Sequence, residues 1–150
     1  MTDDARAAAD LLTSYARAWA DGSPDGLVAL WDADRFRFYK AEEVAHVFTR
    51  WDEVLDYWRG NAGMHRAVRL GFDAVAAWPL EGGWSTAWCR MRWDIRFSAG
   101  APGPLAERAM GGWNHVLLLT HRSRLAGWSE TPDAAITYLR ALYEDQARGV

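Results

Sequence analysis

The chain has 150 residues, of which 50% are hydrophobic and 25% are charged, and its formal net charge is −3. This length and composition are typical of one globular domain, so we expect residues 1–150 to form a single domain. The acidic balance argues against nucleic-acid binding, which uses a basic surface. The sequence shows no secretory leader, no apolar run of membrane length and only one cysteine, Cys89. These features predict a cytoplasmic protein with no disulfide bond and no membrane segment.

The first part of the chain has the apolar spacing of helices. Leucine, tyrosine and tryptophan recur at helical intervals over residues 1–20, and residues 21–22, Asp-Gly, end the pattern. Ser23 and Pro24 are typical of an N-cap and a first helical position, so a short second helix should follow them. Residues 49–52 have the form of a capping box, which predicts a third helix that Gly-Asn at 60–61 should end.

After residue 64 the apolar positions recur with a period of two, which is typical of strands. In the strand expected over 84–97, apolar side chains alternate with polar and charged ones, so one face of the sheet should be covered. Gly111 and Gly112 suggest a β-bulge. Residues 131–133 resemble the cap of a final amphipathic helix. The strands expected are 35–40, 65–78, 84–97, 109–121 and 124–130.

Helices that are segregated from a run of strands predict an α+β fold: a curved antiparallel sheet wrapped around N-terminal helices, with a C-terminal helix. The segments YARAWADGSPDGLVALW, from Tyr15 to Trp31, and GWNHV, from Gly112 to Val116, resemble the NTF2-like superfamily. That superfamily includes ketosteroid isomerase, scytalone dehydratase and the SnoaL-type polyketide cyclases. The resemblance covers nearly the whole chain and implies a cone with a pocket between the helices and the concave sheet face. It does not by itself imply one activity, since this fold carries many.

The resemblance to ketosteroid isomerase implies roles for three residues. In that enzyme a helix tyrosine and a neutral aspartate form an oxyanion hole, and another aspartate carries the proton. Tyr15 and Asn114 take the first two positions, and an amide can donate a hydrogen bond without a change of protonation. From the residues alone, Tyr15 is either this donor or a core aromatic, and Asn114 either faces a ligand or is a structural or exposed amide. Tyr39 takes the third position, where a phenol with a pKa of about 10 is a weak base at neutral pH. The resemblance therefore implies groups that polarise a carbonyl, without a carboxylate base at Tyr39.

Several further side chains are candidates for the pocket. His65 is either an acid–base group or a hydrogen-bonded strand residue, and the spacing of the four histidines is not that of metal ligands. Glu130 either reaches the mouth of the cone or is a charge near the final helix. Apolar side chains on predicted inner faces either line a ligand pocket or fill the core. Those we expect to contact a ligand are Trp19, Trp58, Trp93 and Met91.

The polar face of the strand 84–97 carries Trp84 and Trp88 among arginines and Asp94. Exposed indoles are costly, and tryptophan and arginine are enriched at the centres of interfaces. We therefore expect a homodimer through this outer sheet face, with Asp94 of one chain near an arginine of the other. The alternative is that the final helix folds back over the same face.

Two functions are consistent with these patterns, and both have a small, apolar molecule as ligand. The first is an enzyme without cofactor or metal that isomerises, dehydrates or cyclises an apolar carbonyl compound. Tyr15 and Asn114 would polarise the carbonyl, and His65 or Tyr39 would transfer protons. The second is a non-catalytic module for ligand binding or dimerisation.

Overall fold

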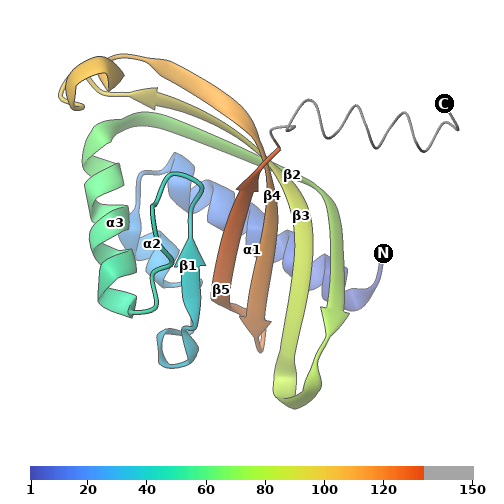
Figure 1. Ribbon diagram of the computed structural model, residues 1–150. Coiled ribbons are helices and arrows are strands. Elements are labelled where there is room, and N and C mark those ends of the chain that lie inside the picture. Colours follow the sequence, from blue (N-terminus) through green and yellow to red (C-terminus); the bar gives the residue numbers. More distant parts are fainter. Residues whose placement is uncertain (134–150) are drawn as a thin grey trace, which may run out of the picture.

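The computed structural model describes residues 1–133, which form helices packed against a five-stranded sheet (Figure 1). This arrangement confirms the α+β class. The predicted C-terminal helix lies outside the described residues. The elements in chain order are α1 (Asp3–Ala20), α2 (Pro24–Val28), the 3-10 turn η1 (Ala33–Arg35), β1 (Phe38–Lys40), α3 (Trp51–Met64), β2 (His65–Pro79), the 3-10 turn η2 (Glu81–Gly83), β3 (Trp84–Phe97), the 3-10 turn η3 (Gly103–Leu105), β4 (Ala109–His121) and β5 (Arg124–Pro132).

The first two helices begin at hydroxyl caps. The Thr2 hydroxyl accepts a hydrogen bond from the N–H of Ala5 at 3.2 Å, at the start of α1. The Ser23 hydroxyl accepts one from the N–H of Gly26 at 2.9 Å, which confirms the predicted start of α2. Each cap satisfies a backbone donor that has no partner within the helix.

The ends of α3 differ from the prediction at both sides. Arg50, not the preceding threonine, is the N-cap, and its N–H donates to the Glu53 carboxylate at 3.2 Å. The predicted capping box is therefore wrong by one residue. The helix also continues through Gly60 and Asn61 to Met64. Asn61 is buried, so packing holds this last turn helical although glycine disfavours it.

The sheet has the strand order β1-β5-β4-β3-β2. The three pairs among β2 to β5 are antiparallel, whereas β1 pairs with β5 in parallel, with Phe38 opposite Gly127. The sheet is thus mixed, and the prediction of a purely antiparallel sheet is wrong at this edge. The strand expected over 35–40 begins only at Phe38, after the 3-10 turn that ends at Arg35, so its prediction is too long. A three-residue strand carries no pattern that indicates its direction. Its partner lies more than 80 residues further along the chain, after a long crossover of the kind that parallel pairs need.

Gly111 and Gly112 do not form the predicted bulge. Both pair in continuous register with β3, opposite Asp94 and Trp93. A Cβ on Gly112 would lie 3.2 Å from the Trp93 ring, and one on Gly111 would lie 2.6 Å from the Asp94 carboxylate. These glycines therefore leave space for cross-strand side chains. The irregularities of the sheet lie elsewhere, in β2 and near the turn between β4 and β5.

Residues 131–133 do not cap a helix where the sequence predicted one. β5 continues to Pro132, with Thr131 opposite His115 and Pro132 opposite Asn114. The pattern Thr-Pro-Asp is typical of a helix start, but pairing with β4 keeps its first two residues extended. Proline is compatible with this position because β1 pairs with β5 only as far as Ser129, so β5 is an edge strand at Pro132.

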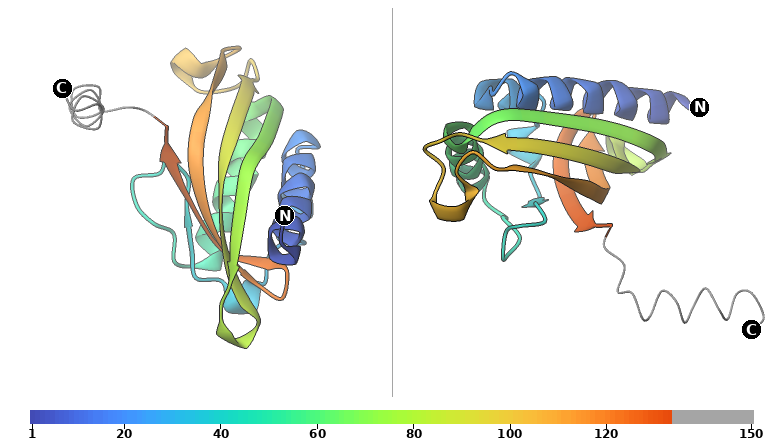
Figure 2. Two further views of the ribbon diagram at one scale, coloured as in Figure 1. Left: turned by 90° about the vertical axis from the view of Figure 1, so that its right-hand side faces the viewer. Right: turned by 90° about the horizontal axis from the view of Figure 1, so that it is seen from above.

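The sheet is covered on one face by the helices. α1 lies along this face, and the ends of β2, β3 and β4 bend over α3 (Figures 1 and 2). Ala87, Cys89 and Met91 of β3 point to the covered side and are buried, while their neighbours are exposed or half-buried. Burial raises the pKa of the Cys89 thiol to about 12, which suits a packing residue and not a nucleophile.

No helix among residues 1–133 is long and apolar enough to cross a bilayer. The cytoplasmic location stays a prediction, as does the single domain.

Candidate functional site

A cavity of about 330 Å³, here called the main cavity, lies between the helices and the covered face of the sheet. Its size is in the range of small-molecule sites. One side is apolar and is formed by strand residues such as Val68, Leu70, Met91 and Ile95. The other side is polar and contains tyrosines, Asn114 and three glutamates. The polar side chains are Tyr15, Tyr39, Glu42, Glu43, Tyr57, Asn61, Asn114 and Glu130.

The carboxylate of Glu130 accepts three hydrogen bonds in the wall of this cavity. The indole N–H of Trp128 donates to its Oε1 at 2.8 Å. The backbone N–H of Glu42 and the amide of Asn114 donate to its Oε2 at 3.2 and 3.3 Å. Trp128 and Glu130 share one face of β5, so the strand itself holds the carboxylate and its closest donor together.

Burial raises the pKa of Glu130 from 4.5 to about 7. Its hydrogen bonds to Trp128 and to the Glu42 backbone act in the opposite direction, because they stabilise the ionised form. The carboxylates of Glu43 and Glu42 add to the rise through repulsion. A carboxyl group with this pKa exchanges its proton near neutral pH, as a general acid or base must.

Tyr15 of α1 and Tyr39 of β1 place their hydroxyl groups 3.4 Å apart beside the cavity. Both residues are only 1% exposed, and burial raises both pKa values above their usual range. The two phenols therefore stay protonated at neutral pH. Since one hydroxyl donates to the other, one O–H remains free to donate to a ligand.

Asn114 is fixed by β4 and is 1% exposed. Its amide N–H donates to Glu130, while its Oδ1 has no partner among residues 1–133. A buried acceptor of this kind costs free energy unless a ligand or water donates to it. The indole N–H of Trp93 is likewise buried without a partner in the described chain. Both side chains line the cavity.

The loop after β1 carries Glu42 and Glu43 to the cavity, and Lys40 organises it. The Lys40 ammonium donates to the carbonyl oxygens of Ala41, Glu42 and Val44 at 2.7, 3.4 and 2.5 Å. At the tip of the loop, the Tyr57 hydroxyl of α3 donates to the Glu43 carboxylate. The only lysine of the chain is thus a structural residue.

Replacement of Lys40 by methionine is expected to loosen this loop without unfolding the protein. Three carbonyl oxygens lose a charged donor, and hydrogen bonds to charged groups contribute about 1.5–3 kcal/mol. Amide hydrogen exchange over residues 41–48 should become about 10- to 100-fold faster. Arg59→Met removes one charge from an exposed site on α3 and serves as the control. Equal exchange in wild type and Lys40→Met would contradict the assigned role of Lys40.

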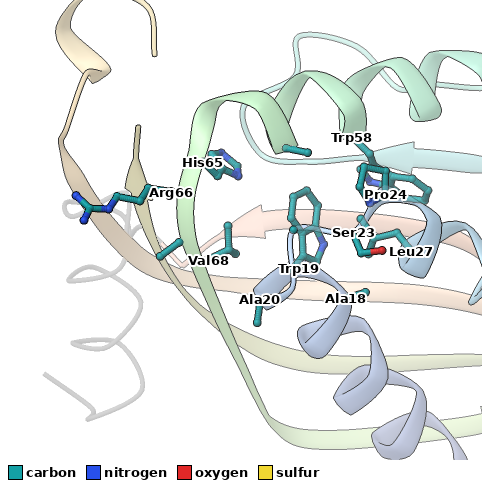
Figure 3. A pocket seen from close by; sticks show the side chains of 13 residues that line it. Ala18, Trp19, Ala20, Ser23, Pro24, Leu27, Trp58, His65, Arg66 and Val68 are labelled. Atoms are coloured by element: carbon teal, nitrogen blue, oxygen red, sulfur yellow. The ribbon is translucent and has the colours of Figure 1, made fainter. Parts of the chain in front are cut away.

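His65 and Trp19 line both the main cavity and a smaller cavity of about 40 Å³ beside α2. Figure 3 shows Trp19 between Val68 and His65 on one side and Pro24 on the other. Burial lowers the pKa of His65, so its imidazole is neutral at pH 7, and its Nδ1 has no partner among the described residues. Within residues 1–133, no group of three His, Cys, Asp or Glu side chains is arranged to hold a metal ion.

The structure brings seven of the eight site residues expected from the sequence to the main cavity. Trp58 is the exception: it is 1% exposed, packs against Trp31 and Tyr39, and lines only the smaller cavity. The roles of all eight in ligand binding or catalysis stay predictions. The seven are Tyr15, Trp19, Tyr39, His65, Met91, Trp93 and Asn114.

Sequence reasoning left Glu130 without a role and did not find Glu42, Glu43 or Tyr57. The alternation of β5 places Glu130 on the same face as Trp128, and this signal was available from the sequence. No periodicity marks Glu42 and Glu43, because they lie in a loop whose position depends on contacts with distant parts of the chain.

No family model and no curated protein matches this sequence. Solved structures do match. An NTF2-like superfamily protein from Salmonella enterica serovar Typhimurium has a TM-score of 0.71 at 9% identity, over 88% of this chain and 92% of its own. A candidate dehydratase of the NTF2-like family from Streptomyces avermitilis has a TM-score of 0.72 at 15% identity, over 88% and 98%.

A protein with a ketosteroid isomerase-like fold from Catenulispora acidiphila, solved in complex with trimethylamine, also matches. Its TM-score is 0.59 at 17% identity, over 87% of this chain and 89% of its own. Low identity with high coverage establishes the architecture and leaves the activity open. The chain therefore has the NTF2-like fold that its sequence resemblance implied.

Proposed function

We propose that the main cavity binds a small, largely apolar molecule and that Glu130 transfers a proton to or from it. The reaction class is a cofactor-independent isomerisation, dehydration or cyclisation of a carbonyl compound. The observation that carries this proposal is a carboxyl group with a pKa of about 7 in the wall of a largely apolar cavity. Glu130 takes over the proton transfer that we first expected from His65 or Tyr39.

The groups around Glu130 complete the chemistry. A carbonyl compound becomes more acidic at its α-carbon when donors stabilise the negative charge that develops on its oxygen. The free O–H of the Tyr15–Tyr39 pair and the N–H of Trp93 are such donors on the cavity wall. Since both phenols stay protonated at neutral pH, they act as donors and not as bases.

The proposal is tested with 5-nitrobenzisoxazole, a small aromatic probe for a carboxylate base. The base removes the C–H proton as the ring N–O bond breaks, and the product is a coloured cyanophenolate. The catalysed rate should rise with pH and level off above pH 7, because only the carboxylate form of Glu130 accepts a proton. The other titratable groups that influence Glu130 or are influenced by it are Glu42, Glu43, Tyr15, Tyr39 and Tyr57.

A rate that follows hydroxide concentration without levelling off would show that no cavity group is the base. In that case the non-catalytic binding module becomes the better interpretation.

We also propose that two copies associate through the outer sheet face. Trp84 and Trp88 are less exposed than the sequence suggested, because each packs against a histidine of β4. The ring centroids of Trp88 and His115, which stack, are 5.4 Å apart, and those of Trp84 and His121 are 4.9 Å apart. The Asp94 carboxylate forms an ion pair with the Arg92 guanidinium of the same strand, at 3.3 Å. The exposed large apolar side chains of this face come instead from β2 and β4. Trp78 of β2, opposite Thr86, is 52% exposed. Trp113 is 39% exposed and Leu117 is 49% exposed.

Leu117→Glu is expected to separate the dimer, because each interface would then hold two new charges in place of two apolar side chains. Burying a leucine contributes about 1.5–3 kcal/mol, so the dissociation constant should rise at least tenfold. Light scattering at micromolar concentration measures the change. Leu80→Glu is the matched control, since Leu80 is also 49% exposed but lies in the turn between β2 and β3. A wild-type monomer would disprove the dimer.

A further inference from the structure

We infer that the ligand of the main cavity carries a cationic amine, and that Glu42, Glu43 and Oδ1 of Asn114 receive it. This inference rests on the proposed function, since it assigns a ligand class to the same cavity. It concerns the polar side of the cavity, where the loop 41–44 approaches β4 and β5.

The polar side offers acceptors that have no donors. Oε2 of Glu42 and Oδ1 of Asn114 are both buried and unpartnered within residues 1–133. Asn114 is 99% buried, since only 1% of it is exposed. Carbonyl, ether or carboxylate groups of a ligand cannot satisfy these atoms, because they too are acceptors. An ammonium group has three donors and is the complementary partner.

The charges near these acceptors have one sign. Among residues 1–133, Glu42, Glu43 and Glu130 all line the cavity, and no arginine or lysine does. His65 is the one basic side chain that the described part of the chain brings to it, and burial keeps that imidazole neutral. The Lys40 ammonium is bound to carbonyl oxygens of the loop backbone. Glu43 is exposed, whereas Oε2 of Glu42 is buried. A buried carboxylate oxygen without a cation or donor is costly, and a bound cation offsets part of that cost.

Three tyrosine rings lie at the polar side of the cavity. The ring centroids of Tyr39 and Tyr57 are 5.6 Å apart, and the hydroxyl groups of Tyr15 and Tyr39 are 3.4 Å apart. All three residues line the cavity. The faces of phenol and indole rings attract cations, most strongly where water is excluded. Acceptors, negative charge and aromatic faces thus favour the same ligand group.

Three probes of similar shape test the inference: 4-phenylbutylammonium, 4-phenylbutan-1-ol and 4-phenylbutanoate. Their binding is measured by calorimetry at pH 8, where Glu130 is ionised and the amine is still protonated. We expect the ammonium to bind at least tenfold more tightly than the alcohol, and the carboxylate to bind most weakly. The apolar side of the cavity receives the phenyl group in all three.

The double variant Glu42→Gln/Glu43→Gln locates the effect. It should lose at least tenfold in affinity for the ammonium and keep its affinity for the alcohol within about twofold. Retained alcohol binding also shows that the cavity is intact. The matched control is Asp10→Asn/Glu81→Gln, which removes two charges from exposed positions on α1 and η2. It should bind the ammonium as the wild type does.

The outcomes separate this inference from the proposed function. Two results would disprove the inference that the ligand is an amine: the alcohol binds as tightly as the ammonium, or the control double variant loses as much affinity as Glu42→Gln/Glu43→Gln. In both cases the cavity remains a ligand site. If none of the three probes binds, the cavity is not a ligand site, and both the proposed function and the amine inference are disproved. If the ammonium binds as expected but 5-nitrobenzisoxazole is not cleaved, only the catalytic role of Glu130 is disproved.

Discussion

Glu130→Gln is expected to lower the rate of 5-nitrobenzisoxazole cleavage by about 10²- to 10⁴-fold, the usual contribution of a positioned general base. Glutamine has the shape of glutamate, but its NH2 group replaces one of the two accepting oxygens, and its amide does not accept a proton at neutral pH. The initial rate at pH 8 is the measurement, because the wild-type carboxylate is ionised there.

Two further variants define this result. Glu81→Gln removes the same charge from an exposed position in η2. This turn joins β2 to β3 at the end of the hairpin opposite to the His65–Phe97 pair, so the variant should retain full activity. Glu130→Asp keeps a carboxyl group that is one methylene shorter, so its rate should lie between those of the wild type and Glu130→Gln. If Glu130→Gln stays within threefold of the wild type, the base is another group, and His65 is the next to test.

Between pH 5 and pH 8, the stability of Glu130→Gln relative to the wild type is expected to rise by up to ~3 kcal/mol. The pKa of Glu130 is about 7 in the folded protein against an ordinary value of 4.5. The folded state therefore binds this proton more tightly than the unfolded state does. Its contribution to stability is fully present below about pH 4.5 and is lost as the pH rises through 7. Glutamine stays neutral and does not lose it.

Urea unfolding at a series of pH values checks this expectation. The unfolding free energy of Glu130→Gln minus that of the wild type should grow between pH 5 and pH 8 and then level off. Taking the difference cancels the titration of other groups that the two proteins share. The comparison of Glu81→Gln with the wild type should be flat over this range. A difference for Glu130→Gln that does not change with pH would mean that the carboxyl group titrates normally when folded.

The sequence predicted the fold well where side-chain patterns are local. The alternation in β3 and β4 predicted both strands with the bounds found, 84–97 and 109–121. Long strands with one covered face repeat this signal many times, so tertiary packing agrees with it. The prediction failed where a few residues depend on distant partners, as in the parallel pairing of β1 and the extension of β5 through Pro132.

The candidate site could be predicted only in part for the same reason. Tyr15, Tyr39 and Asn114 belong to regular elements, and the family resemblance indicated their positions. Glu42 and Glu130 are 88 positions apart in the sequence and are hydrogen-bonded in the structure. The residue pattern of neither segment predicts this contact. The raised pKa of Glu130 results from its burial, to which the loop 41–44 contributes. It could therefore be recognised only from the structure, which places this loop.

The coordination of Lys40 has a consequence for the covalent chemistry of this protein. Acylating reagents attack the neutral, uncoordinated amine, while the single ε-amino group of this chain is engaged with three backbone carbonyl oxygens. Coupling to activated esters should therefore favour the α-amino group and give a nearly uniform conjugate with one attachment point. Lys40 would receive a second label only when the loop opens. The rate at which the doubly labelled protein appears, followed by its mass, therefore reports how often the loop opens.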